Sequence, residues 1–287
     1  MPRRTCAIPA GTYLLGDAFD EGYPFDAEGP QRDVTLEAFD IDATPVTNTQ
    51  FAHFVDATGY LTDAERYGDS AVFHLAVAAS ADDVLGRASG SPWWLAVRGA
   101  SWRRPYGPLS DLADVGDHPV VHVSWRDAVA YAEWAGRALP TEAQWETAAR
   151  GGLVGARFAW GDELTPGGKW MCNIWQGRFP DHNTAEDGWL ATSPVGAFPP
   201  NGYGVFDVAG NVWDWCADRF ETTPPAPAGR GGSLLPIVQE ERRVMRGGSY
   251  LCHDSYCNRY RVAARTGNTP DSTAGNCGFR TVSLPQA

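Results

Sequence analysis

Two cysteines stand five residues apart near the end of the chain, in the run GGSYLCHDSYC over 247–257. The C-x4-C spacing of Cys252 and Cys257 differs from the C-x-x-C spacing of redox motifs and zinc ribbons. Two thiols at this spacing can meet across a tight loop, either as a disulfide or as a pair of thiolate ligands. Paired thiolates select soft metal ions, and Cu(I) foremost when only two sulfurs are offered. The spacing alone leaves an ordinary pair of buried cysteines equally open.

Basic residues surround this pair in the sequence. His253, Arg259, Arg261 and Arg265 carry charge that favours thiolate over thiol. A zinc site with four ligands would need two more ligands from distant parts of the chain. In a reducing cytoplasm, free thiols are the ordinary state of cysteine in a chain of this length. The remaining cysteines are scattered, at Cys6, Cys172, Cys216 and Cys277.

A second group of residues is rich in oxygen. Carboxylate and amide side chains interleaved with turn glycines suit Ca²⁺, which takes 6–8 oxygen ligands including backbone carbonyls. The D-x-D-x-D-G pattern of an EF-hand is absent, and turn formation by Asn, Asp and Gly is the more ordinary explanation. The residues concerned are Asn173, Asn183, Glu186 and Asp187, followed by Asp207, Gly210, Asn211, Asp214 and Asp218.

Short elements must position these side chains. Apolar alternation predicts strands over 8–16 and 34–41. Capping residues, followed by apolar residues at helical spacing, predict helices over 47–59, 124–135 and 141–150.

Beyond residue 160 the chain becomes dense in Gly, Asn, Asp and aromatic residues, with few regular periodicities. Loops of this length in a compact domain tend to carry function. We expect 222–232, rich in Pro and Gly, to form a mobile surface loop, and 279–282 to return as a closing strand. Trp93, Trp94 and Trp102 are more typical of core or loop anchors than of a ligand platform.

Composition predicts one loop-rich domain over 1–287. Hydrophobic residues make up 43% and charged residues 20%, which is enough apolar mass for a core. The counts of 12 Trp, 32 Gly and 21 Pro favour long loops pinned by indole rings. The sequence shows no internal repeat and no coiled-coil pattern.

The charge balance is acidic, 23 − 35 = −12, with a pI near 4.9. An acidic surface argues against nonspecific binding to nucleic acid or anionic membrane, and suits a basic peptide. The start, MPRRTC, is not followed by the apolar run of a secretory signal, and no apolar run is long enough to span a membrane. We therefore expect a cytoplasmic protein. We also expect a monomer.

Several motifs in order along the chain resemble the formylglycine-generating enzymes, also called sulfatase-modifying factors. The run over 247–257 is specific to the catalytic members of that family. The other motifs are IPAG (8–11), TGYLT (58–62), WW (93–94), DHPVVHVSW (117–125), LPTEA (139–143), NIWQG (173–177) and PPNGYG (199–204).

The resemblance implies an irregular mixed α/β fold related to C-type lectins, with little regular secondary structure. It implies that the chain uses O₂ to oxidise the cysteine of a C-x-P-x-R motif in a sulfatase polypeptide to Cα-formylglycine. Cys252 and Cys257 would bind Cu(I) as a two-coordinate thiolate pair, and the substrate thiolate would add as a third sulfur ligand. Two soft ligands leave the metal coordinatively open, as catalysis requires.

Further site residues are implied by their positions in the family's motifs. Ser249, Tyr256 and Asn276 match active-site residues, and Thr273 stands where the family often has serine. One or two structural Ca²⁺ ions are also implied, and Asp207 and Asp214 replace the Asn and Glu of relatives while keeping oxygen ligands. The first set of calcium ligands is Asn173, Ile174, Asp187 and Trp189, and the second is Asp207, Gly210, Val212 and Asp214, with Ile174, Trp189, Gly210 and Val212 contributing backbone carbonyls.

Three other interpretations stay open. The chain could be a non-catalytic binding protein of the same fold, although such paralogues lack the cysteine pair. It could be an iron-dependent sulfoxide synthase, although that class needs an additional helical domain with histidine ligands. It could also be a metal-free thiol oxidase in which Cys252 and Cys257 cycle through a disulfide.

Overall fold

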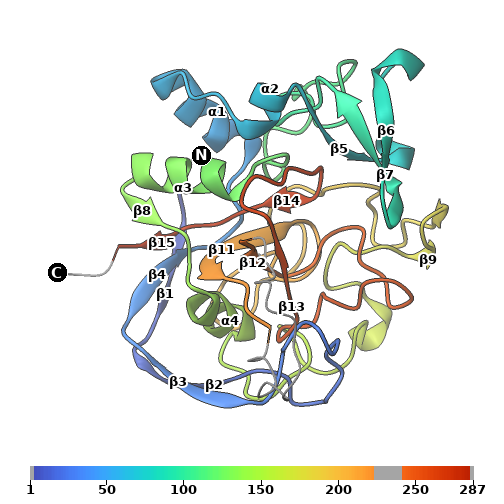
Figure 1. Cartoon of the computed structure of the whole chain (residues 1–287). Coiled ribbons are helices and arrows are strands. Elements are labelled where there is room, and N and C mark those ends of the chain that lie inside the picture. Colours follow the sequence, from blue (N-terminus) through green and yellow to red (C-terminus); the bar gives the residue numbers. More distant parts are fainter. Residues whose placement is uncertain (1–2, 223–240, 285–287) are drawn as a thin grey trace, which may run out of the picture.

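The computed structural model describes residues 3–222 and 241–284, in which short helices and strands are joined by long loops (Figure 1). The mixed α/β class predicted from the sequence is confirmed. The predicted loop over 222–232 lies outside the described residues, apart from Thr222. The helices are α1 (Asn48–Thr58), α2 (Asp63–Tyr67), α3 (Trp125–Trp134) and α4 (Glu142–Arg150), with 3₁₀ turns at His74–Ala76, Ala81–Asp83 and Pro166–Gly168.

Local capping signals account for where the helices begin. All four of these α-helices have a capping box, in which a Ser or Thr side chain and a residue three positions later satisfy each other's backbone amides. In α1, Thr47 and Gln50 form this box and Gly59 ends the helix in the left-handed conformation, as predicted. The short α2 was not predicted, although Thr62 and Glu65 carry the same signal.

A four-stranded sheet crosses the middle of the molecule in the order β13-β12-β11-β14 (Figure 1). Its strands β11 and β14 are parallel, and the other pairs are antiparallel. The run 247–257 begins where β12 ends, and Asn276 directly precedes β14. The sheet therefore brings two distant loops together. Its strands are β11 (Trp213–Arg219), β12 (Arg243–Arg246), β13 (Arg265–Asn268) and β14 (Cys277–Gly278).

The two strands predicted near the N-terminus are each divided between two sheets. The predicted strand over 8–16 breaks at Pro9, which has no amide proton for a central ladder, and the one over 34–41 breaks at residues 37–38. Single strands over these ranges were therefore wrong. β2 (Gly11–Leu15) pairs with β3 (Arg32–Leu36), whereas β1 (Thr5–Ile8), β4 (Phe39–Asp42), β15 (Val282–Ser283) and β8 (Arg137–Ala138) form a sheet in that order.

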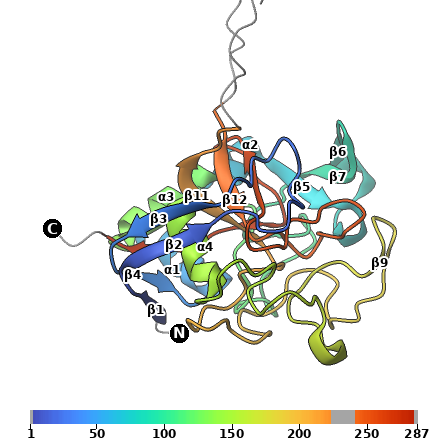
Figure 2. The same ribbon diagram turned by 90° about the horizontal axis from the view of Figure 1, so that it is seen from below.

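The strand β2 packs against α4, as the view from below shows (Figure 2). The backbone amide of Gly16, just after β2, donates to Glu146 Oε1 on α4 at 2.7 Å. Segment 17–28 follows and leads towards β3. The pairing of β2 with β3 and the bond from the Asp17 amide to the Glu28 carbonyl hold the two ends of this segment together.

A smaller sheet in the order β5-β7-β6 lies towards one edge of the molecule (Figure 1). Trp102 is fully buried beyond this sheet, as expected of a core anchor. Trp93 and Trp94, on β7, are half-buried and pack against a core cluster as expected of anchors, and they also line a pocket. The strands are β5 (Asp69–Phe73), β6 (Val84–Ala88) and β7 (Ser91–Arg98), and a separate pair is β9 (Gly177–Arg178) with β10 (His182–Asn183).

Buried arginines hold the loops to the sheets. Arg246 at the end of β12 is 1% exposed and lies 2.6 Å from Glu146 on α4. It also donates to the carbonyls of Val262 and Ala263, which anchors the chain beyond the thiol pair. A buried charge is tolerated when it is paired and hydrogen-bonded in this way. Among the described residues, no helix is long and apolar enough to cross a membrane.

Candidate active site

The structure brings the two thiols of the 247–257 run into contact. Cys252 Sγ and Cys257 Sγ lie 2.9 Å apart, and both cysteines are buried and free. The backbone amide of Cys257 donates to the carbonyl of His253, which closes the turn between them. Gly248 has φ +75°, and a Cβ there would lie 2.9 Å from the Arg259 carbonyl and 3.2 Å from Cys252 Sγ. Glycine is thus required where the loop folds back on the pair.

The two sulfurs differ in their electrostatic surroundings. The hydrogen bond from Cys252 lowers the pKa of Cys257, and the Arg259 guanidinium acts in the same direction against burial. Burial and the neighbouring sulfur raise the pKa of Cys252. Of the two thiols, Cys257 is therefore the one that loses its proton more readily.

The thiols form part of the wall of a cavity of about 210 Å³. The cavity also contacts Ser249, Tyr256 and Asn276, which are three of the residues predicted for the site. The pocket thus gathers five of the six predicted catalytic residues. Its other walls are Trp93, Trp94, Trp213, Met245, Leu251, Arg259, Thr266, Gly267, Asn268, Ala274 and Cys277.

Ser249 and Asn276 are joined in the pocket wall. Asn276 Nδ2 donates to Ser249 Oγ at 3.0 Å, and the amide of Ser249 faces Cys252 Sγ at 3.4 Å. Trp213 donates its amide to the Asn276 carbonyl, so the central sheet fixes this contact. Thr273 does not line the pocket, and its hydroxyl lies 2.7 Å from Ser70 Oγ instead. The structure thus separates Thr273 from the thiol pair.

Aromatic rings form one side of the pocket. The ring of Tyr256 stacks on Phe179 with centroids 4.5 Å apart and lies edge-on to Trp93 at 4.6 Å. Tyr256 is still 39% exposed, so it stands at the pocket mouth. Burial raises its pKa to about 12, and the hydroxyl is protonated at neutral pH. This wall offers a flat apolar surface with a hydroxyl donor to a bound peptide.

Of the four basic residues near the pair in sequence, only Arg259 reaches it. Arg259 Nη1 lies 3.8 Å from Cys257 Sγ. Arg261 pairs with Glu28 and Arg265 pairs with Glu142. His253 Nδ1 contacts Ser255 Oγ at 2.8 Å and Asp254 at 3.0 Å, away from the sulfurs.

Sequence reasoning missed other members of the pocket. Cys277 lies in its wall as a third buried thiol, and its Sγ contacts Asn276 Oδ1 at 3.5 Å. Burial raises the pKa of Cys277 to about 12, so it is protonated at neutral pH. Its position directly after Asn276 was the available signal. Trp93 and Trp213 were also missed, because only tertiary packing places them here.

The first oxygen-rich group is assembled around Asp187. Its carboxylate accepts amide protons from Ile174 at 3.1 Å and Trp189 at 2.9 Å, and a side-chain proton from Gln176 at 2.8 Å. Burial raises its pKa. Among the described residues, the buried Oδ1 of Asn173 has no hydrogen-bond partner. Asn173 and Asp187 supply oxygen ligands of the kind that Ca²⁺ takes, although the Asp187 carboxylate and the Ile174 carbonyl already accept protons from this chain, the latter from Gln176.

The second oxygen-rich group already contains a cation. Arg280 Nε donates to Asp214 Oδ2 at 2.6 Å, and Arg280 Nη2 donates to the Asp207 carbonyl at 2.9 Å. Asp207 accepts the amide of Gly196, and burial raises its pKa to about 6. Asp214 Oδ1 is buried without a hydrogen-bond partner in the described part of the chain. Arg280 supplies part of the charge that a metal would otherwise supply.

The arrangement as a whole can hold one soft metal ion or close into a disulfide. Within residues 3–222 and 241–284, no three His, Cys, Asp or Glu side chains gather as metal ligands. Cys252 and Cys257 would thus be the only ligands of these four residue types for a soft metal bound at the pair, among the described residues. An open two-sulfur site beside aromatic and amide groups suits chemistry on a peptide that enters from solvent.

The whole chain is similar to a known family. Residues 1–284 match the family described as "Sulfatase-modifying factor enzyme 1-like domain". A protein of Streptomyces coelicolor named formylglycine-generating enzyme is 63% identical over 279 residues, covering 95% of this chain and 87% of the relative. A protein of the same name from Thermomonospora curvata is 57% identical over 281 residues, covering 97% and 93%.

Other similarities show how widely the fold is used. A relative from Mus musculus named "Inactive C-alpha-formylglycine-generating enzyme 2" is 44% identical over 279 residues, covering 96% of this chain and 84% of the relative. The structure of PvdO from Pseudomonas aeruginosa superposes with a TM-score of 0.66 at 24% identity, covering 97% of this chain and 93% of that one. This likeness supports the predicted fold class and says nothing of activity.

Proposed function

The chain belongs to the sulfatase-modifying factor family, and we propose that it is a formylglycine-generating enzyme, which oxidises a cysteine of a sulfatase polypeptide. The observation that carries this proposal is the contact of Cys252 and Cys257, 2.9 Å apart in the wall of an open pocket. The relatives of highest identity described above carry the name of that activity. The family also has inactive members, so the thiol pair rather than the fold argues for catalysis.

The proposed client is a cysteine within C-x-P-x-R, and the reaction replaces its CH₂–SH group by CHO. The sulfur leaves as H₂S. O₂ accepts four electrons, and the net reaction yields the aldehyde, H₂S and one molecule of water. The cysteine methylene supplies two of these electrons, so a thiol reductant must supply the other two and become a disulfide.

Cu(I) fits the donor set of Cys252 and Cys257, because both ligands are soft sulfurs and both are buried from water. When bound, the metal would supply O₂ activation and a coordination position for the client thiolate. The protein residues hold the two sulfurs through the turn at His253 and the amide of Ser249. Binding of the metal by both sulfurs would displace the proton that lies between Cys252 and Cys257.

The remaining pocket residues are proposed to bind and orient the client peptide. Asn276 and Ser249 present an amide and a hydroxyl near the sulfurs, and Tyr256 presents a ring and a protonated hydroxyl at the mouth. Trp93 widens this apolar wall, which suits the proline of the motif. Thr273 acts at a distance, by holding the loop that bears Asn276 through Ser70.

We also propose a structural Ca²⁺ held by Asn173, Asp187 and the carbonyls of Ile174 and Trp189. The unpartnered oxygen of Asn173 supports this set. A second ion at Asp207, Gly210, Val212 and Asp214 stays a prediction, because Arg280 already neutralises part of that group. Removing calcium should then lower thermal stability without touching the thiol pair.

The direct test is mass spectrometry of a C-x-P-x-R peptide incubated with the protein, O₂ and a thiol reductant, with and without copper. We expect a product whose mass corresponds to replacement of CH₂–SH by CHO. Cys252→Ser should abolish this product, whereas Cys216→Ser, which removes a buried thiol outside the pocket, should keep it. Unchanged aldehyde formation by Cys252→Ser would contradict the proposal.

The 2.9 Å separation also favours a second candidate, a metal-free thiol oxidase in which Cys252 and Cys257 close into a disulfide. The two candidates differ in their response to a strong Cu(I) chelator. Full turnover of metal-free protein with the chelator present would favour the disulfide route. Loss of turnover that returns with added Cu(I) would favour the copper route.

The proposed partners are the sulfatase polypeptide and O₂. The net charge of −12 suits a client motif that contains arginine and disfavours nucleic acid. The single domain over 1–287, the monomeric state and the cytoplasmic location stay predictions. Size-exclusion chromatography with light scattering would test the monomer directly.

A further inference from the structure

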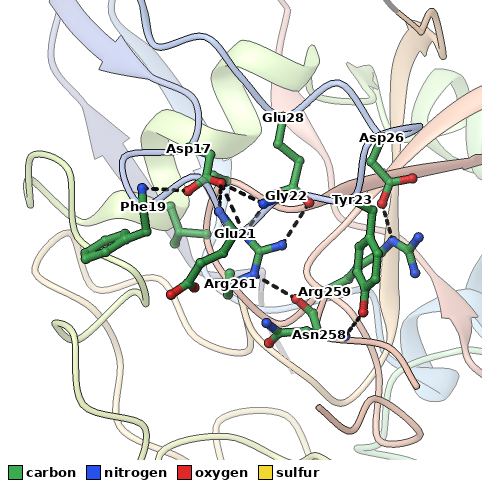
Figure 3. Close-up of polar contacts among 12 residues, drawn as sticks. Asp17, Phe19, Glu21, Gly22, Tyr23, Asp26, Glu28, Asn258, Arg259 and Arg261 are labelled. Carbon is green, nitrogen blue, oxygen red and sulfur yellow. Dashed lines mark hydrogen bonds and ion pairs between the residues drawn. The ribbon is translucent and has the colours of Figure 1, made fainter. Parts of the chain in front are cut away.

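Segment 17–28, between β2 and β3, lies against the residues that directly follow the thiol pair (Figure 3). The amide of Asn258 donates to Tyr23 Oη at 2.9 Å. Arg261 donates to both carboxylate oxygens of Glu28, at 2.7 and 2.8 Å, and lies 3.9 Å from Asp17. Two distant parts of the chain thus meet immediately beside Cys257.

The segment itself is held by its own hydrogen bonds. Asp17 accepts the amides of Phe19, Glu21 and Gly22 at 2.9, 2.7 and 2.8 Å. The amide of Asp17 donates to the Glu28 carbonyl, which closes the segment at its base. A segment fixed in this way can hold a side chain without paying ordering entropy at the moment of binding.

Arg259 is the side chain that the segment holds. Its Nε lies 2.5 Å from Asp26 Oδ2, and its guanidinium lies 4.2 Å from the centre of the Tyr23 ring. Its Nη1 faces Cys257 Sγ at 3.8 Å. Figure 3 shows the guanidinium between Tyr23 and Asp26. The carboxylate and the ring fix the plane of the guanidinium, so one nitrogen is aimed at the sulfur.

Among the described residues that line the pocket, Arg259 is the only one with a permanent charge. Two thiolates with one monovalent cation carry a net charge of −1. A client thiolate that joins them changes the net charge to −2. The other residues that line the pocket are uncharged. A fixed cation at the rim of such a site attracts the incoming anion and stabilises it there.

We propose that segment 17–28 fixes Arg259 as the positioning residue that offsets the charge of the client thiolate when it joins Cys252 and Cys257. This inference rests on the proposed function, because it concerns how the client sulfur is bound. It adds an element from the N-terminal part of the chain to a site whose thiols, Ser249 and Asn276 all lie within residues 249–276. The carboxylate of Asp26 and the ring of Tyr23 set the direction of the charge, and Arg259 supplies it.

The test measures peptide affinity rather than turnover. Protein loaded with Cu(I) under anaerobic conditions is titrated with a labelled C-x-P-x-R peptide and with the matching S-x-P-x-R peptide, and binding is followed by fluorescence anisotropy. Wild type should prefer the cysteine peptide. Arg259→Gln should weaken the cysteine peptide by roughly tenfold to a hundredfold, the usual effect of losing a charged hydrogen-bond donor, and leave the serine peptide unchanged. Arg259→Lys should restore part of the preference.

Two further variants control for folding. Arg259→Gln leaves Asp26 buried without its cation, so the pair Asp26→Asn with Arg259→Gln replaces the ion pair by two amides and should show the same selective loss. Arg157→Gln is the matched control. Arg157 also pairs with a carboxylate and an aromatic ring of this segment, Glu21 at 2.6 Å and Phe19 at 4.4 Å, but it contacts no thiol.

The outcomes distinguish a wrong role for Arg259 from a wrong proposed function. If wild type prefers the cysteine peptide, and both Arg259→Gln and the double variant Asp26→Asn with Arg259→Gln keep that preference, the inference is wrong and the proposed function stands. If both peptides weaken equally in Arg259→Gln, the residue is merely structural and the inference is again wrong. If wild type binds the two peptides equally, the client sulfur is not recognised, and the proposed function falls together with the inference.

Discussion

Acidification from pH 7 to pH 5 should destabilise this protein through His122. This imidazole is fully buried beneath the loop that carries Thr273 and Asn276. Its Nε2 donates to the Pro105 carbonyl at 2.7 Å, and its Nδ1 lies 2.7 Å from Ser70 Oγ. The backbone amide of His122 also donates to the Ala274 carbonyl. Burial lowers the pKa of His122 to about 4, because the charged ring would lose its hydration without gaining a counter-charge.

The magnitude follows from the difference between the two states. The unfolded chain takes up the proton near pH 6.5 and the folded protein only near pH 4. The stability that His122 contributes is complete above the unfolded value and is lost as the pH falls towards the folded one. Between pH 7 and pH 5 the loss is about 2 kcal/mol, and below pH 4 it approaches about 3 kcal/mol.

Urea unfolding of wild type and His122→Asn at pH 7, 6 and 5 measures this contribution. Asparagine tolerates the left-handed backbone of this position, where φ is 58°, and does not titrate in this range. The variant should be less stable at pH 7, because it loses the bond to Pro105. The difference between the two proteins should then shrink by about 2 kcal/mol at pH 5. Parallel stability curves over this range would refute the reasoning.

Three further predictions concern the loops around the site. Gly210→Ala should destabilise the fold by more than about 2 kcal/mol in urea titration, since the added Cβ would lie 2.0 Å from the Asn173 carbonyl, whereas Gly86→Ala meets nothing within 4 Å and should change stability little. EDTA should lower the thermal midpoint of wild type, with added Ca²⁺ restoring it, and Asn173→Ala should remove that response; a midpoint indifferent to EDTA would argue against the calcium site. Tyr256→Phe keeps the ring on Phe179, so thermal stability should hold; a lower kcat at unchanged KM would assign a role to the hydroxyl, and unchanged kinetics would deny it one.

The helices were predictable from sequence because their signals are local. Thr47, Ser124 and Thr141 cap their helices through residues three positions later, and no distant contact is needed to decide the outcome. The strands were less predictable, because pairing is a property of distant segments. Pro9 divides one apolar run between two sheets, and the alternation along that run does not reveal which partner each half takes.

The site was predictable to the extent that it is contiguous in the chain. Cys252, Cys257 and Ser249 lie in one short run, and the glycines and thiols of that run indicate a tight loop with two neighbouring sulfurs. The sequence does not distinguish Arg259 from Arg261 and Arg265. Only the fold shows that, of these residues, Arg259 faces the Cys257 sulfur. Trp93 comes from a distant strand, and nothing in its local sequence separates a pocket wall from a core anchor.

The strand β15 has a consequence for the order of folding. It lies between β4 and β8 in its sheet, with Val282 paired to Ile41 on one side and to Ala138 on the other. Segments made early in synthesis must therefore wait for one of the last strands before this sheet can close. Such non-local closure slows folding. We expect a chain that lacks residues 277–283 to form neither this complete sheet nor the finished pocket.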